Sequence, residues 1–178
     1  MKIRTLIKPL IVAIAITLPM LAVAEEHAAH VHGGAKLQVA IDGNTVTLML
    51  ESPMESLVGF EHAASNDAEK ASLAKLVNEL NAPQKLFIFT AAAGCKTTSV
   101  KLESPLIADE PHEHKHDEKH QETHSDLDGE FVFNCSAADK LKGLTVNLFD
   151  IAANLQDLDV EVAAPHGQTA AELKPDKR

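Results

Sequence analysis

The chain has 178 residues, of which 26 are acidic and 16 basic, and a formal net charge of −10 at pH 7. This charge repels nucleic acids and anionic lipids and attracts cations, so a nucleic-acid-binding role is excluded. Six Phe and no Trp or Tyr leave few aromatic platforms for stacked ligands, and the length suits a single domain.

The first 24 residues have the plan of a cleavable export signal. Lys2, Arg4 and Lys8 precede an apolar run that ends in small residues at Ala24. The alternative is an uncleaved membrane anchor, but the sixteen residues from Pro9 to Ala24 contain two prolines and fall short of the ~20 that a spanning helix needs. We predict cleavage after Ala24. The remaining domain, residues 25–178, then has a net charge of −13, no membrane span and a location outside the cytoplasm.

Alternating apolar residues predict a β-hairpin at the start of this domain. Apolar side chains occupy every second position over residues 36–41 and again over residues 46–50. The intervening Asp42-Gly43-Asn44 supplies residues that favour a tight turn. Because strand residues alternate between the two faces, we expect one face of the hairpin to be buried.

One helix is expected near residues 66–81, after a connection over residues 54–62. Asn66 or Ser65 can cap its first turn. Charged residues lie on the side opposite its apolar residues, which recur at helical spacing. These apolar residues are Leu73, Leu76, Val77 and Leu80.

The rest of the domain predicts further strands that complete the sheet. The expected strands are 86–90, 97–103, 130–134, 144–149, 155–162 and 170–173, with a turn at Pro165-His166-Gly167. The predicted fold is therefore mainly β (α+β), an antiparallel sheet or sandwich with one helix and a long disordered loop rich in His, Asp and Glu.

Cys95 and Cys135 are the two cysteines of the chain. In an oxidising compartment such a pair predicts a disulfide. A pair of thiolate metal ligands is the alternative, although zinc sites usually bring two cysteines within a few residues of each other. Antiparallel pairing of strands 97–103 and 130–134 with the cysteines opposite each other suits a disulfide that fixes the two ends of the intervening loop. The inward faces of these two strands do not match cleanly in that register.

The strongest chemical signal is a tract of metal-ligand residues. Thirteen of the twenty residues 109–128 are His, Asp or Glu, so the insertion at 105–128 lacks a core of its own. Four histidines are spaced by four, and on a transient helix each adjacent pair could chelate one zinc with a carboxylate or water. The alternative is a solvated charged linker. The candidate ligands are His112, His114, His116, His120, His124, Asp117 and Glu118.

A second cluster of histidines stands at the predicted new N-terminus. His30 and His32, with His27 or the freed α-amino group, could form a site with three ligands. A flexible polar leader is the alternative. His62 could join this site from the core, although a single His beside a carboxylate is more often structural. Imidazole and carboxylate groups suit zinc, nickel or cupric copper.

Enzyme motifs are missing from the sequence. It has no His-Glu-x-x-His helix, no Gly-x-Ser-x-Gly elbow and no phosphate-binding glycine loop. We therefore expect a metal-binding protein that is not an enzyme.

Several segments resemble a known family. They are HVHGGAKLQVAIDG at 30–43, LESP at 50–53, LVGFEH at 57–62 and PHGQ at 165–168, together with one Cys on each side of the His-rich insertion. They resemble the ZrgA-like family of periplasmic zinc-binding proteins, formerly a domain of unknown function. The resemblance covers nearly the whole domain. It implies a periplasmic protein of Gram-negative bacteria that assists zinc uptake alongside an ATP-driven importer and its solute-binding protein.

The expected function is capture or buffering of zinc, with several ions loosely bound. Many weak ligands favour fast loading and release over a closed structural site. One rival is a metal-tolerance sequestrant or a nickel or copper chaperone. Another is a zinc-dependent hydrolase, which would hold one tightly bound ion with an open coordination position.

Overall fold

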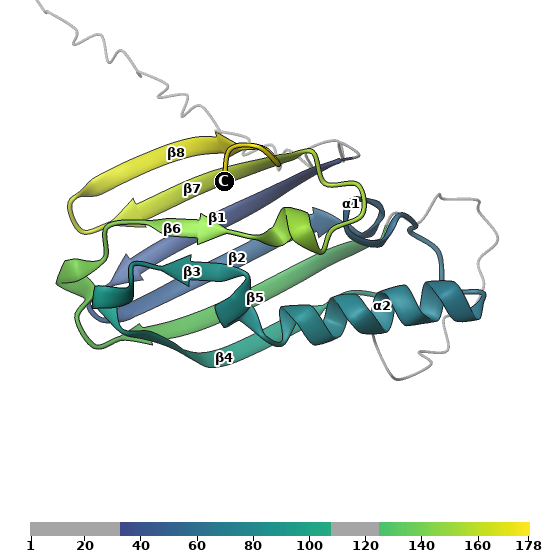
Figure 1. Ribbon diagram of the computed structural model, residues 1–178, viewed down its shortest axis with the longest axis horizontal. Coiled ribbons are helices and arrows are strands. Elements are labelled where there is room, and N and C mark those ends of the chain that lie inside the picture. The colour runs from purple at the N-terminus through teal and green to yellow at the C-terminus, as the bar shows by residue number, and fades with distance from the viewer. Residues whose placement is uncertain (1–32, 108–124) are drawn as a thin grey trace, which may run out of the picture.

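The computed structural model describes residues 33–107 and 125–178 of the chain. Eight strands and two α-helices occur in this part, with short 3-10 turns between them (Figure 1). The strands are β1 (Gly34–Asp42), β2 (Thr45–Pro53), β3 (Phe87–Phe89), β4 (Cys95–Glu103), β5 (Asp126–Cys135), β6 (Leu144–Val146), β7 (Asp157–Ala164) and β8 (Gly167–Leu173). The helices are α1 (Met54–Val58) and α2 (Asp67–Leu80), and the 3-10 turns are η1 (Pro83–Lys85), η2 (Ala91–Ala93), η3 (Ala138–Lys140) and η4 (Leu148–Asp150).

Six strands form one sheet in the order β4-β5-β2-β1-β7-β8. All neighbours in this sheet are antiparallel except β1 and β7, which run parallel. The mainly β fold with a helix near residues 66–81 is therefore confirmed. The short helix α1 is an addition, because residues 54–58 were predicted to be part of an irregular connection.

The expectation that residues 144–149 complete the same sheet was wrong. Only Leu144–Val146 is a strand, and it pairs with β3 in a separate two-stranded sheet, whereas Leu148–Asp150 is a 3-10 turn. This small sheet lies over one face of the large one, where Phe87 is 1% exposed and packs against Phe131 with ring centroids 5.0 Å apart.

The β1–β2 hairpin forms in the predicted register. Asp42 pairs with Thr45 across the turn. Gly43 has φ 54°, a conformation that a residue with a side chain rarely adopts. The apolar positions alternate inward as expected, and Leu37 and Leu48 are fully buried.

An irregularity in the pairing of β4 with β5 explains why simple alternation did not match the inward faces of these strands. Cys95 lies opposite Cys135 as predicted, and Thr97 lies opposite Phe133. The register then shifts by one residue, so that Ser99 lies opposite Val132. Such a β-bulge moves the following residues of β4 to the opposite face of the sheet.

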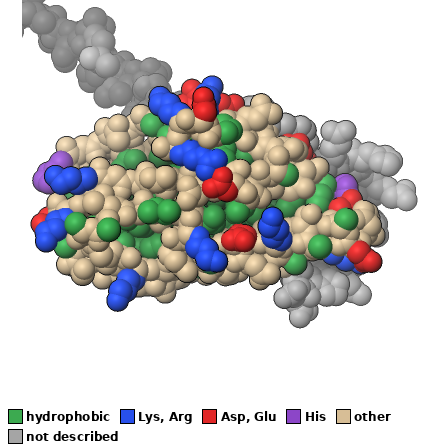
Figure 2. All heavy atoms as spheres, viewed as in Figure 1, with side chains coloured by type: hydrophobic (Ala, Val, Ile, Leu, Met, Phe, Trp, Pro, Cys, Tyr) green, Lys and Arg blue, Asp and Glu red, His purple; other side chains and the backbone are tan. Residues whose placement is uncertain are grey.

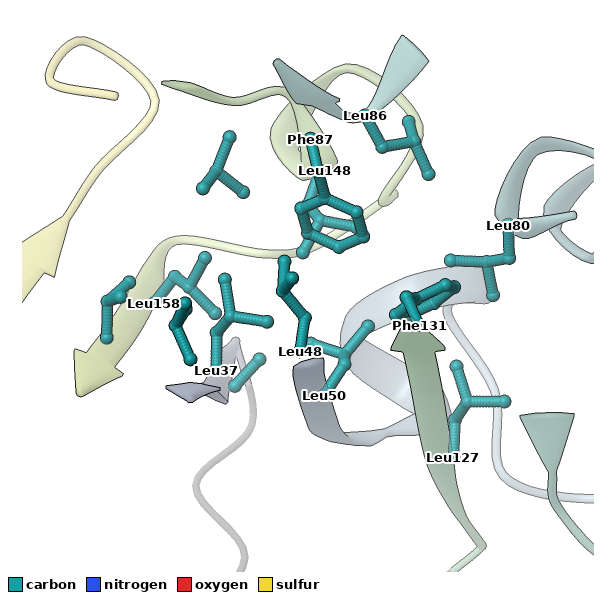
Figure 3. Close-up of a cluster of buried hydrophobic side chains, with 14 of the residues drawn as sticks. Leu37, Leu48, Leu50, Leu80, Leu86, Phe87, Leu127, Phe131, Leu148 and Leu158 are labelled. Atoms are coloured by element: carbon teal, nitrogen blue, oxygen red, sulfur yellow. The ribbon is translucent and has the colours of Figure 1, made fainter. Parts of the chain in front are cut away.

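The core lies between the large sheet and the elements that cover it (Figure 3). Leu80 of α2 points toward Phe131 of β5, and Leu148 lies beside Phe87. Full burial of a side chain such as Phe87 contributes about 1.5–3 kcal/mol.

Helix α2 is fixed at its start by side chains. The Asn66 side chain accepts a hydrogen bond of 3.0 Å from the Glu69 N–H, so Asn66 is the cap. The Glu69 carboxylate in turn accepts bonds from the Ser65 N–H at 2.7 Å and the Ser65 hydroxyl at 2.9 Å. Both predicted capping residues therefore take part.

The other face of the six-stranded sheet is not covered by any described helix or strand. Its central side chains, including Lys36, Gln38, Glu130 and Glu161, are exposed. None of the helices in residues 33–107 and 125–178 has the length and apolar character to cross a membrane.

Candidate metal site

Both His-rich segments join the described fold next to α1. Gly33 directly follows His32, and Ser125 directly follows His124. The Gly33 N–H donates to the Ser56 hydroxyl at 3.0 Å, and the Met54 N–H donates to the Ser125 carbonyl at 2.8 Å. The first described residue after each segment is therefore bound to the same five-residue helix.

The sheet register brings the two entry points to one end of the fold. Lys36 of β1 and Asp128 of β5 both lie opposite Glu51 of the intervening β2. Adjacent strands are about 4.8 Å apart, so β1 and β5, which lie on either side of β2, are separated by about 10 Å. Gly33 lies three residues before Lys36, and Ser125 lies three residues before Asp128. Glu103, the last residue of β4, also lies opposite Asp128, so the chain leaves β4 at the same end.

Local sequence explains how α1 holds these entry points. β2 ends at Pro53, and Gly59 closes α1 with φ 89°, which a residue with a side chain rarely adopts. Met54 and Leu57 anchor the helix in the core. On its other side, the Asn154 N–H donates to the Ser56 carbonyl at 3.0 Å. The helix is thus attached to the core, to both entry points and to the segment before β7.

A row of carboxylates crosses the uncovered face of the six-stranded sheet at this end. Glu103, Asp128 and Glu51 are direct cross-strand neighbours. The row continues through Lys36 to Asp159 and Glu172. Like charges directly opposite each other destabilise a sheet, so this row favours the approach of cations.

Besides Lys36, two further lysines partly neutralise the row. The Lys101 ammonium lies 2.9 Å from the Glu103 carboxylate, and this bond, with the charges of Glu103 and Glu130, raises the pKa of Lys101. Lys174 lies 3.0 Å from Glu172 and 3.2 Å from Asp157. Its bonds to these carboxylates raise its pKa. Because these pairs are exposed, they add little to stability.

His62 is exposed and does not lie in the core, and its part in a metal site stays a prediction. It lies in the connection between α1 and α2, where its Nδ1 is 3.1 Å from the Ala63 carbonyl oxygen and its ring stacks on Phe60 at 5.3 Å. The pKa of Glu69 is lowered, mainly by its hydrogen bonds from Ser65 and to a smaller extent by His62. The contacts of His62 with Ala63 and Phe60 favour a structural role for this residue.

The other predicted ligands lie outside the described residues. They are His27, His30, His32, His112, His114, His116, Asp117, Glu118, His120 and His124. Within residues 33–107 and 125–178, no three His, Cys, Asp or Glu side chains are grouped so that they could hold a metal ion. The metal ligands therefore remain a prediction from sequence.

The insertion is shorter than its predicted range of 105–128. Asp126 pairs with Pro53 and Asp128 with Glu51, so both acidic residues belong to β5. The alternation of Leu127 and Gly129 with Phe131 extends the strand to Asp126, a signal that the high charge obscured.

A comparison with protein families matches residues 29–178 to the ZrgA family zinc uptake proteins. The chain belongs to this family. A comparison with curated proteins found no match. The family description gives this ZrgA-family chain a role related to zinc uptake, and the family is not a known enzyme family.

Cys95 and Cys135 of this ZrgA-family chain form a disulfide with an S–S distance of 1.99 Å, so they are not free thiolate ligands. Their position corrects one expectation. Cys95 begins β4 and Glu103 ends it, so the disulfide lies about 26 Å from the end of the hairpin that carries the insertion. It fixes the far end of the hairpin, not the two ends of the loop.

His166 lies at that far end as well. It occupies the predicted turn between β7 and β8, and β7 runs parallel to β1, so the turn is opposite the end where Gly33 enters. Sequence reasoning did not identify Ser56, whose buried hydroxyl accepts a hydrogen bond from Gly33 at the entry end. No local pattern distinguishes this serine from others.

Proposed function

We propose that this protein captures zinc in the periplasm and passes it to an ATP-driven zinc importer, through that importer's solute-binding protein. The zinc-uptake family supports the metal and the pathway. The apolar segment with basic residues before it, ending at Ala24, supports export and cleavage. The protein acts as a binding protein with no catalytic step.

The observation that carries the proposal is that Gly33 and Ser125, which directly follow the two His-rich segments, are both bound to α1. One segment ends in His32 immediately before Gly33, and the other ends in His124 immediately before Ser125. Because β1 and β5 begin about 10 Å apart at one end of the sheet, ligands from the two segments are tethered close together. Tethering raises the effective concentration of each segment near an ion held by the other.

The chemistry of the tract suits reversible loading. His112, His116, His120 and His124 are borderline ligands for zinc, and Asp117 and Glu118 can complete its coordination. His114 and the leader residues His27, His30 and His32 add further imidazoles. We propose that several zinc ions bind loosely to this set.

The carboxylate row supports capture of cations at the same end. Glu103, Asp128 and Glu51 lie where the chain leaves β4 and enters β5. Their negative potential raises the local concentration of divalent cations over a distance of about 8–10 Å at physiological ionic strength.

Calorimetric titration of zinc into residues 25–178 tests the proposal. We expect more than one ion per chain. Replacing residues 109–124 with a short Gly-Ser linker should remove most of this capacity, because it removes the tract but keeps the Ser125 carbonyl and all of β5. Starting the chain at Gly33 should remove a smaller part.

His166→Gln is the matched control, since His166 lies at the opposite end of the sheet. It should leave the stoichiometry unchanged. Unchanged zinc binding after removal of both segments would contradict the proposal. Parallel titrations with nickel and cupric copper test selectivity, and stronger binding of either metal under competition would favour a chaperone or tolerance role.

A further inference from the structure

The two edges of the six-stranded sheet differ in how they are protected. Edge strands present unpaired backbone N–H and C=O groups, which proteins usually protect with lysines, prolines or bulges. On the β4 edge, the bulge between Thr97 and Ser99 interrupts the strand, and Lys96 and Lys101 project from it. This edge is therefore poorly suited to pairing with another chain.

The β8 edge has none of these devices within its seven residues. Its sequence, GQTAAEL, contains no lysine or proline, and its seven pairs with β7 run without a bulge. Every residue from Gly167 to Glu172 is exposed. Among the described residues, β7 is the only strand that pairs with β8, which forms the border of the sheet (Figure 1).

The C-terminal residues turn away from this edge. The Lys174 ammonium is bound to Asp157 and Glu172. Arg178 then reaches Asp150 of η4, with its Nη1 2.6 Å from the carboxylate, and lies over the Phe149 ring. Both contacts hold the end of the chain against η4.

We propose that β8 pairs antiparallel with β8 of a second copy of this chain. A two-fold axis at Ala170 uses all seven residues of the strand. Ala170 then faces Ala170 of the partner subunit, and Thr169 faces Ala171 of the partner subunit. Glu172 faces Gln168 of the partner subunit, so the amide can donate to the carboxylate and no like charges stand opposite each other.

The small side chains at the centre favour this contact. Ala170 and Ala171 leave the backbone accessible, and the same strand in both copies satisfies the symmetry of a two-fold interface. A seven-residue strand gives an interface at the small end of the range for protein pairs, so the dimer depends on concentration.

This arrangement also leaves the α1 end of the sheet, where Gly33 and Ser125 lie, accessible. A two-fold axis perpendicular to the sheet places the α1 ends of the two copies on opposite sides of the interface. The dimer therefore does not depend on the proposed zinc sites, and failure of one proposal leaves the other intact.

Analytical ultracentrifugation of residues 25–178 over a range of concentrations tests the interface. The protein is oxidised and kept in EDTA, which prevents histidines from bridging two chains through metal. We expect a monomer–dimer equilibrium. Ala170→Lys and Ala170→Glu should each weaken dimerisation roughly fivefold or more, because each places like charges opposite one another at the axis.

Mixing the two variants supplies the decisive result. Ala170→Lys and Ala170→Glu chains should form a heterodimer, since opposite charges then meet at the axis. Ala163→Lys, an exposed position one strand further in on β7, is the matched control and should dimerise like the parent. A monomer at every concentration, a dimer unaffected by Ala170→Lys, or variants that do not recover on mixing would each overturn the proposal.

Discussion

The Ser56 hydroxyl accepts a hydrogen bond of 3.0 Å from the Gly33 N–H and lies 3.1 Å from the Gly34 carbonyl oxygen, to which it donates. Ser56 is fully buried, so one side chain satisfies a donor and an acceptor at the point where the chain enters β1. Gly33, which directly follows the segment with His27, His30 and His32, is thereby bound to α1.

Ser56→Ala should destabilise the protein by about 1–3 kcal/mol, because it leaves the buried Gly33 N–H and Gly34 carbonyl without this partner. Urea unfolding followed by circular dichroism measures the change. Ser72→Ala, at an exposed position in α2, is the control and should change stability by no more than about 0.5 kcal/mol. Equal stability of the two variants would show that the Ser56 contacts do not stabilise the fold.

Glu69 should make the stability of α2 depend on pH. Its pKa is lowered from 4.5 in the folded protein, mainly by hydrogen bonds from Ser65. A lowered pKa adds stability above the unfolded value, and this stability is lost as pH falls through the folded value. Glu69→Gln should therefore lower the melting temperature at pH 7 and have little effect near pH 2.

The control for this comparison is Glu79→Gln, in the last turn of the same helix. It removes a carboxylate without touching the Ser65 contacts. An equal difference from the parent at both pH values for Glu69→Gln would contradict the linkage.

Zinc binding should weaken steeply between pH 7.5 and about pH 5.5. Zinc must displace protons from imidazoles, whose ordinary pKa is about 6.5. Calorimetry in two buffers of different ionisation enthalpy measures both the affinity and the number of protons released. An affinity that is constant over this range would indicate carboxylate ligands without histidine.

Removing the disulfide should lower stability without altering zinc stoichiometry. The bridge closes a loop of 40 residues, which corresponds to about 4 kcal/mol in the chain-entropy model. Replacing Cys95 and Cys135 together with Ser should therefore cost up to this amount in urea unfolding. Zinc binding should be unchanged because the bridge lies about 26 Å from the entry end.

A thiol assay on the unfolded, unreduced parent protein provides the control and should detect no free thiols. Two free thiols that zinc protects from reaction would instead make the cysteines ligands.

Local patterns predicted the elements that depend on neighbouring residues. The β1–β2 hairpin follows from period-two alternation and the turn at Gly43, and α2 follows from helical spacing with a cap at Asn66. The pairing of Cys95 with Cys135 also follows, since a disulfide restricts the register of the two strands.

Pairings between distant segments could not be predicted in the same way. The parallel contact of β1 with β7 joins residues more than a hundred positions apart, and alternation does not identify a strand's partner. Similarly, residues 144–146 have a strand pattern, but only the tertiary fold assigns them to β3 in place of the large sheet. The metal ligands are predicted from the sequence alone. They lie outside the described strands, so strand pairing gives no information about how they are arranged.

The position of the insertion between two directly paired strands separates its proposed metal binding from folding. β4 and β5 are already aligned by their register and by the bridge at their far end, so the connecting segment does not determine how they meet. Doubling the length of a flexible loop costs only about 0.6 kcal/mol in closure entropy. Residues 109–124 can therefore change in length or composition through small genetic steps, and the proposed zinc capacity can change with them while the sheet stays the same.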